Sequence, residues 1–179
     1  MPVTPLHYGV AYIIGKAGKG LVLPALVVGS MLPDLEPFVS ILTGGYTAPR
    51  GFMHSLLGAI TIDLFLTILV TWRLYPKLAS GIFKIEKEEV VEKCRFSGML
   101  ILSSLIGTLS HVLIDSLNHE YNPLLHPFAY DSFDAFVLFG DWVIAAIIIQ
   151  LVLLGILAVI FVYEAKMGRK GFWKRILVG

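Results

Sequence analysis

GTLSHVLIDSLNHEYNPLLHPF, residues 107–128, is the stretch around which the rest of the chain is organised. It places His111 and Asp115 four residues apart, about one turn of a helix, and adds His119 and His126 just beyond them. The residues that precede this group are strongly apolar. Because ionisable side chains are costly in hydrocarbon, such a cluster at the end of an apolar segment predicts a functional site. Imidazole and carboxylate groups together predict metal ligands.

The composition is that of an integral membrane protein. Of the 179 residues, 56% are hydrophobic and 15% are charged, which is too apolar for an ordinary soluble domain. We therefore expect residues 1–179 to form a single membrane-embedded domain. The net charge of +1 gives no sign of a nucleic-acid partner. Cys94 is the one cysteine, so the chain can form neither an internal disulfide nor a thiolate metal site of its own.

Three segments are apolar and long enough to cross a bilayer, namely residues 55–72, 96–117 and 142–163. The N-terminal apolar runs, residues 5–16 and 21–32, each span about 12 residues, whereas a transmembrane helix needs about 20. Neither run is expected to cross alone. The sequence therefore predicts an all-α integral membrane protein with about three full transmembrane helices and a re-entrant or short-helix N-terminal hairpin.

The distribution of basic residues predicts the orientation in the membrane. Of the fourteen Lys and Arg residues, six lie in residues 73–95 and five in the tail, residues 164–179. The positive-inside rule then places residues 73–95 in a cytoplasmic loop and the tail in the cytoplasm. The ends of the spans that carry the histidines face the other side. We expect a multi-pass protein of the inner (cytoplasmic) membrane whose metal site lies on the extracytoplasmic side.

This topology brings the histidines and several carboxylates to one level of the membrane. Imidazole and carboxylate ligands suit zinc and, with more oxygen ligands, manganese or iron. Two ions about 3.5–4 Å apart would clamp a phosphoester and generate hydroxide from bound water. The residues at this level are His7, Asp34, Glu36, His54, His111, Asp115, His119 and His126.

Structural roles are the alternative for most of these residues. His111 and Asp115, taken alone, could form a hydrogen-bonded pair. His54 could belong to a helix cap formed with Ser55. Asp63 lies inside a predicted span on roughly the opposite face from His54, where an interhelical polar contact is expected. Asp34 and Glu36 could be solvated loop acids, and His126 could be an outer-shell or substrate contact. His119 lies one turn past Asp115, near the expected end of the helix, and could be a ligand or not.

Four short motifs resemble those of one family. They are MPVTPLHYG at the start, GSMLPDLE at 29–36, RGFMHSLLG at 50–58 and GTLSHVLIDS at 107–116. These motifs are similar to those of the small prokaryotic membrane proteins described as YdjM-like or DUF4184-type, which are labelled inner-membrane metal-dependent hydrolases. The resemblance covers most of residues 1–128 and implies a membrane-embedded metallohydrolase.

The order of the candidate ligands is more distantly similar to that of zinc-dependent phospholipase C and the S1/P1 nucleases. Those enzymes take ligands from an N-terminal histidine, an aspartate, a histidine and an H-x-x-x-D helix. This similarity implies that Asp115 bridges two zinc ions and that a phospholipase C-like helical site is present. The ligand set of a third ion has no clear counterpart, so we expect two ions. By this similarity His7 binds one ion, and the other takes Asp34, His54 and His111.

We derive two main functional hypotheses. The first is a metal-dependent hydrolase that cleaves a phosphoester, with membrane lipids and a small phosphoester or phospholipid as partners. In it a metal-activated water attacks, Asp34 or Glu36 is the general base, and Arg50 contacts phosphate. The second is a metal-ion or proton transporter that uses the same cluster, for which a homo-oligomer would be needed. Haem ligation by two histidines is a third alternative.

Overall fold

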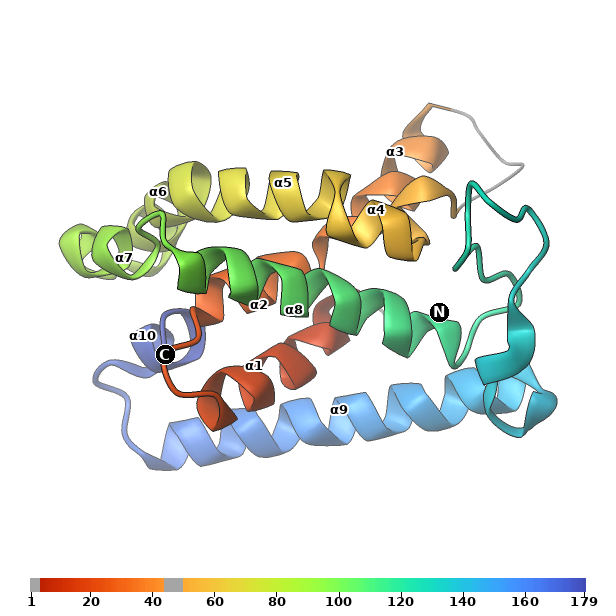
Figure 1. Cartoon of the computed structure of the whole chain (residues 1–179). Helices are drawn as coiled ribbons and strands as arrows, with labels where there is room; N and C mark the ends of the chain where they lie inside the picture. Colours follow the sequence, from red (N-terminus) through yellow and green to blue (C-terminus); the bar gives the residue numbers. More distant parts are fainter. Residues whose placement is uncertain (1–3, 44–49) are drawn as a thin grey trace.

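The computed structural model is a bundle of roughly aligned helices (Figure 1). It describes residues 4–43 and 50–179, and this part of the chain contains helices and turns without any strand. The all-α architecture predicted from the sequence is therefore confirmed.

The helices follow one another with short connections. In chain order they are α1 (His7–Ala17), α2 (Leu23–Gly29), α3 (Leu35–Leu42), α4 (Leu56–Ile60), α5 (Ile62–Leu69), α6 (Tyr75–Phe83), α7 (Lys87–Lys93), α8 (Gly98–Ser116), α9 (Trp142–Lys166) and α10 (Phe172–Leu177). The described residues also form five 3-10 turns and one π-helical turn, namely η1 (Thr4–Leu6) before α1 and, between the helices, η2 (Leu32–Asp34), η3 (Phe52–His54), the π-helical η4 (Val70–Leu74), η5 (Asp134–Phe136) and η6 (Leu138–Gly140).

Four helical stretches of the described chain are long and apolar enough to cross a membrane. They are Leu23–Leu42, Leu56–Phe83, Gly98–Ser116 and Trp142–Lys166. The last three correspond to the three predicted spans. The first extends the second run of the predicted hairpin through η2 into α3. Pro33 lies at the start of η2, where a missing N–H costs nothing, so the helical path continues through it.

The second of these stretches is longer than the sequence suggested. Residues 73–83, expected in a charged loop, continue it as the end of η4 and as α6. Pro76 lies in the first turn of α6, where proline is tolerated. Of the expected loop, residues 84–95 remain outside the stretch and include α7.

The backbones of α2 and α8 approach each other closely. A Cβ atom on Gly107 would lie 2.7 Å from the carbonyl oxygen of Leu26, and one on Gly29 would lie 2.9 Å from that of Ser104. Both distances are too short for any residue but glycine, and small residues allow this kind of close contact between membrane helices. The crossing holds the end of α2 against the middle of α8.

The two ends of the bundle differ in character. In Figure 1, α6, α7, α10 and the C-terminus lie at one end, whereas α3, α4 and the loop that follows α8 lie at the other. The two basic segments predicted to share one side of the membrane therefore lie at the same end of the molecule. There Arg175 Nε contacts Glu164 Oε2 at 2.5 Å, and the hydroxyl of Tyr12 donates to the other oxygen of this buried carboxylate.

Candidate metal centre

Polar side chains from separate segments converge where α1 begins and α8 ends. Two of them lie in short 3-10 turns and the others in the helices α1 and α8. Ser55 caps α4 by accepting a hydrogen bond from the Gly58 amide at 2.9 Å, and the preceding η3 turn carries the histidine inward. The contributing residues are His7 of α1, Asp34 of η2, His54 of η3, and His111 and Asp115 of α8.

Four of these residues have the spacing of metal ligands. One ligand atom from each of Asp34, His54, His111 and Asp115 lies within 4.8 Å of all the others. His111 Nε2 is 3.4 Å from Asp115 Oδ2 and 3.6 Å from Asp34 Oδ1. His54 Nε2 is 3.5 Å from the same Asp34 oxygen. Ligands at about 2.0–2.2 Å from a tetrahedral zinc ion stand about 3.3–3.6 Å apart. This four-residue group could therefore hold one metal ion.

The histidines of the four-residue group present free nitrogen lone pairs. His111 Nδ1 lies 2.8 Å from the carbonyl oxygen of Ser30. Because a carbonyl only accepts, Nδ1 carries the proton and Nε2 keeps its lone pair. The Nε2 atoms of His111 and His54 are buried and have no hydrogen-bond partner in the described part of the chain. A buried, unpartnered acceptor is costly, and a bound cation would satisfy it.

Glu36 holds His54 in place. Its Oε2 atom lies 3.1 Å from His54 Nδ1 and accepts a hydrogen bond from the Gly51 amide at 2.8 Å. Its Oε1 atom accepts one from the Met53 amide at 3.3 Å. A carboxylate on the second nitrogen of a ligand histidine fixes its ring and raises its basicity. Glu36 therefore contacts the four-residue group through His54, while its role as general base stays a prediction.

His7 approaches the opposite oxygen of Asp115. His7 Nε2 is 3.3 Å from Asp115 Oδ1, whereas His111 and His54 approach Oδ2 at 3.4 and 3.9 Å. Neither ring nitrogen of His7 has a hydrogen-bond partner among the residues described. The ring of His7 lies beside that of His111, with centroids 4.4 Å apart. Asp115 thus presents one carboxylate oxygen to the Nε2 atom of His7 and the other to the Nε2 atoms of His54 and His111.

Arg50 supplies a buried positive charge to the centre. Its Nη2 atom lies 2.7 Å from Asp115 Oδ2, and the residue is only 6% exposed. A carboxylate taken out of water needs such a partner, because an unpaired buried charge is strongly destabilising. The role predicted for Arg50, contact with a phosphate, stays a prediction, but the guanidinium lies directly at the cluster.

The two histidines beyond α8 are placed differently. His119 is buried, and its Nδ1 atom donates to the carbonyl oxygen of Asp115 at 2.9 Å. Burial lowers the pKa of His119 to about 4, so the ring is neutral at pH 7. His126 is partly buried, with its ring beside those of Phe52 and Tyr130. Neither histidine belongs to the four-residue group, and ligation by either stays a prediction.

A separate row of polar side chains lies inside the second candidate span. Asp63, Thr67 and Thr71 follow one another at four-residue intervals and are all fully buried. Both oxygens of Asp63 and both threonine hydroxyls have no hydrogen-bond partner among the described residues. The interhelical hydrogen bond that would satisfy Asp63 is thus not found among the described residues. The four-residue spacing of Asp63, Thr67 and Thr71 is a signal in the sequence from which this row could have been predicted.

The fold and the cluster together define a class of protein. It is a multi-pass, all-helical membrane protein with a buried His/Asp cluster that could hold a metal ion. The family model described as YdjM inner membrane protein matches residues 6–177 of the chain. The chain therefore belongs to the YdjM inner membrane protein family, as its four motifs indicated. Searches of curated proteins and of solved structures give no match.

Proposed function

We propose that this protein is a membrane-embedded, metal-dependent hydrolase that cleaves a phosphoester of a phospholipid or a related lipid head group. The observation that carries the proposal is the ligand-like spacing of the four-residue group together with the unpartnered Nε2 atoms of His54 and His111. Two imidazole and two carboxylate ligands favour zinc. Manganese or iron would need further oxygen ligands.

In the proposed reaction the residues of the site have different roles. The four-residue group would hold one ion, and His7 with the second oxygen of Asp115 would contribute to another. When bound, such ions would activate water and neutralise charge on the phosphoryl oxygens. Arg50 can donate two parallel hydrogen bonds to a phosphate. Asp34 is the most exposed carboxylate of the four-residue group, at 13% of its side chain against 4% for Asp115, so it is the one best placed to accept a proton from water.

The location of the site supports a lipid substrate. The cluster lies where α1 begins and α8 ends, and most Lys and Arg residues lie in two segments at the opposite end of the bundle. By the positive-inside rule we place the cluster on the extracytoplasmic side of the inner membrane. A lipid head group on this side of the membrane is therefore the substrate that we propose.

Metal analysis of the purified protein, followed by an activity screen, tests the proposal. We expect stoichiometric zinc and hydrolysis of both a phospholipid and bis(4-nitrophenyl) phosphate. Asp115→Asn should lose metal and activity, because it weakens the ligand shared by both sets of nitrogens. Asp131→Asn is the matched control, since this aspartate is exposed and outside the site. A metal-free protein, or an Asp115→Asn variant that binds zinc normally, would contradict the proposal.

Transport of a metal ion or of protons is the second candidate. The row formed by Asp63, Thr67 and Thr71 favours it, because unpartnered polar groups inside a span are typical of ion and proton pathways. Flux measured in proteoliposomes separates the two functions. Zinc or proton flux that Asp63→Asn abolishes, in a protein that hydrolyses no phosphoester, would favour transport.

A further inference from the structure

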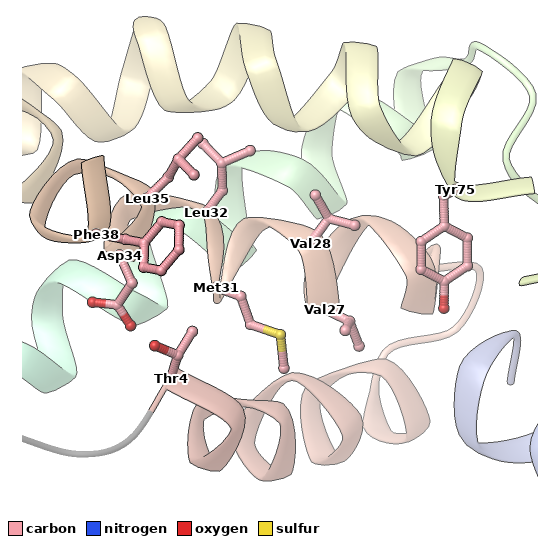
Figure 2. A pocket seen from close by; sticks show the side chains of 9 residues that line it. All are labelled: Thr4, Val27, Val28, Met31, Leu32, Asp34, Leu35, Phe38 and Tyr75. Atoms are coloured by element: carbon pink, nitrogen blue, oxygen red, sulfur yellow. The ribbon is translucent and has the colours of Figure 1, made fainter. Parts of the chain in front are cut away.

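An apolar pocket of about 470 Å³ runs along α2 and ends at the candidate metal centre. Figure 2 shows the Asp34 carboxylate and the Thr4 hydroxyl at one end, and Tyr75 at the other. Between these ends the walls are aliphatic side chains of α2 and η2, with Met31 near the middle and Phe38 of α3 at the side. The volume lies in the range of pockets that bind small molecules, about 300–1,000 Å³.

Among the described lining residues, the polar side chains of Thr4, Asp34 and Tyr75 lie at the ends of the pocket. The Tyr75 hydroxyl is already used, since it donates to the carbonyl oxygen of Leu177 at 2.7 Å. Asp34, at the other end, belongs to the four-residue group. A ligand in this pocket would therefore be apolar along its length and would carry its polar group at the metal centre.

The surroundings of the pocket point to lipid. Leu35 and Phe38 line it and are 49% and 59% exposed. They belong to the candidate span Leu23–Leu42, so in a membrane we expect lipid to cover them. An alkyl chain can enter from this medium without crossing water.

We propose that this pocket binds one acyl chain of the substrate lipid and thereby holds the phosphate of the head group at the metal centre. The proposal rests on the proposed hydrolase function and names its substrate class, a phosphoester lipid with at least one long alkyl chain. The pocket and the metal centre share a residue, because Asp34 lines the apolar pocket and also belongs to the four-residue group. The chain would act as an anchor that orients the phosphoester, a contribution to catalysis that comes from positioning.

Photo-crosslinking tests the binding step independently of activity. The zinc-loaded protein in nanodiscs receives a phosphatidylglycerol that carries a diazirine in one acyl chain, and crosslinked peptides are identified by mass spectrometry. We expect crosslinks on residues 27–38 well above those on the lipid-exposed face of α9. Met31→Trp, which fills the middle of the pocket, should reduce them about tenfold, whereas Ile41→Trp should not. Ile41 is 61% exposed on the same candidate span and does not line the pocket.

Activity ratios complete the test. For each variant, kcat/KM is measured for a long-chain phospholipid and for bis(4-nitrophenyl) phosphate, with zinc content as the check on an intact cluster. Met31→Trp should lower the ratio of the lipid to the soluble diester about tenfold, and Ile41→Trp should leave it unchanged. Uniform crosslinking around the bundle would overturn the pocket proposal. So would an equal ratio of lipid to soluble-diester kcat/KM in the two variants. Neither result would contradict the proposed hydrolase function. Pocket crosslinks without any hydrolysis would overturn the hydrolase, and with it the substrate role of the pocket.

Discussion

His111 Nδ1 donates a hydrogen bond to the carbonyl oxygen of Ser30, 2.8 Å away, across the contact between α8 and α2. The bond is possible because Gly29 and Gly107 let the two helix backbones come together just before it. It leaves His111 Nε2 facing the carboxylates of Asp34 and Asp115. The crossing of two membrane helices thus sets the orientation of a candidate ligand.

Gly107→Ala should weaken zinc binding without touching a ligand. The new Cβ atom would lie 2.7 Å from the carbonyl oxygen of Leu26, so the helices must separate and the His111 bond must lengthen. We expect zinc affinity, measured by competition with a chromophoric chelator, to fall about 10–100-fold. Gly155→Ala is the control, because a Cβ atom there meets nothing within 4 Å. Equal zinc affinities in the two variants would show that the crossing of α2 and α8 does not control zinc binding.

Glu36→Gln should also lower the zinc affinity. Glutamine cannot supply the two carboxylate oxygens that contact His54 and the amides of Gly51 and Met53. We expect about a 10–100-fold loss of affinity by the same chelator competition. Glu120→Gln, at an exposed position, should bind zinc normally. If Glu36→Gln instead keeps its affinity but loses kcat, Glu36 is the general base.

Zinc should raise the thermal stability of the protein. An ion that binds only the folded state at a free concentration 100 times its Kd adds about 2.7 kcal/mol to the free energy of unfolding. We expect a higher Tm in zinc than in chelator, and no such shift in His54→Ala. His126→Ala should keep the shift, because His126 lies outside the four-residue group. Loss of the shift in His126→Ala would make this residue a ligand.

Arg175→Gln should destabilise the fold while leaving the metal centre intact. Arg175 pairs with Glu164, whose side chain is 3% exposed, at the end of the bundle away from the cluster. Removing one partner leaves a buried carboxylate without its cation and should cost about 3 kcal/mol of unfolding free energy. Denaturant unfolding measures this loss, and zinc affinity should not change. Arg95→Gln breaks an exposed pair with Glu92 and should cost little.

Asp63→Leu should stabilise the fold if the row in the second span is only structural. Both carboxylate oxygens of Asp63 are buried without partners among the described residues, and a buried polar group left unsatisfied costs about 1–3 kcal/mol. We expect a higher Tm by differential scanning fluorimetry. Asp131→Leu, at an exposed position, is the control. A lower Tm in Asp63→Leu would mean that the carboxylate has a bound partner such as an ion or water.

The sequence by itself determined the helical class, three of the candidate spans and a short list of candidate ligands. Apolar runs of about 20 residues report spanning helices, and the four-residue spacing of His111 and Asp115 places both on one face of a helix. Both are local properties of the chain. The positive-inside rule supplied the one long-range element, a common level for His7, Asp34 and His54.

Only the tertiary structure decided how these residues meet. In the tertiary structure Glu36 contacts His54, and Arg50 contacts Asp115. The pocket along α2 extends to Asp34. The tertiary structure also extended the second N-terminal run into a fourth candidate span. These features depend on contacts between segments far apart in the chain. They follow from the close approach of α2 and α8 and from the dihedral angles of short turns, and neither leaves a periodic signal in the sequence.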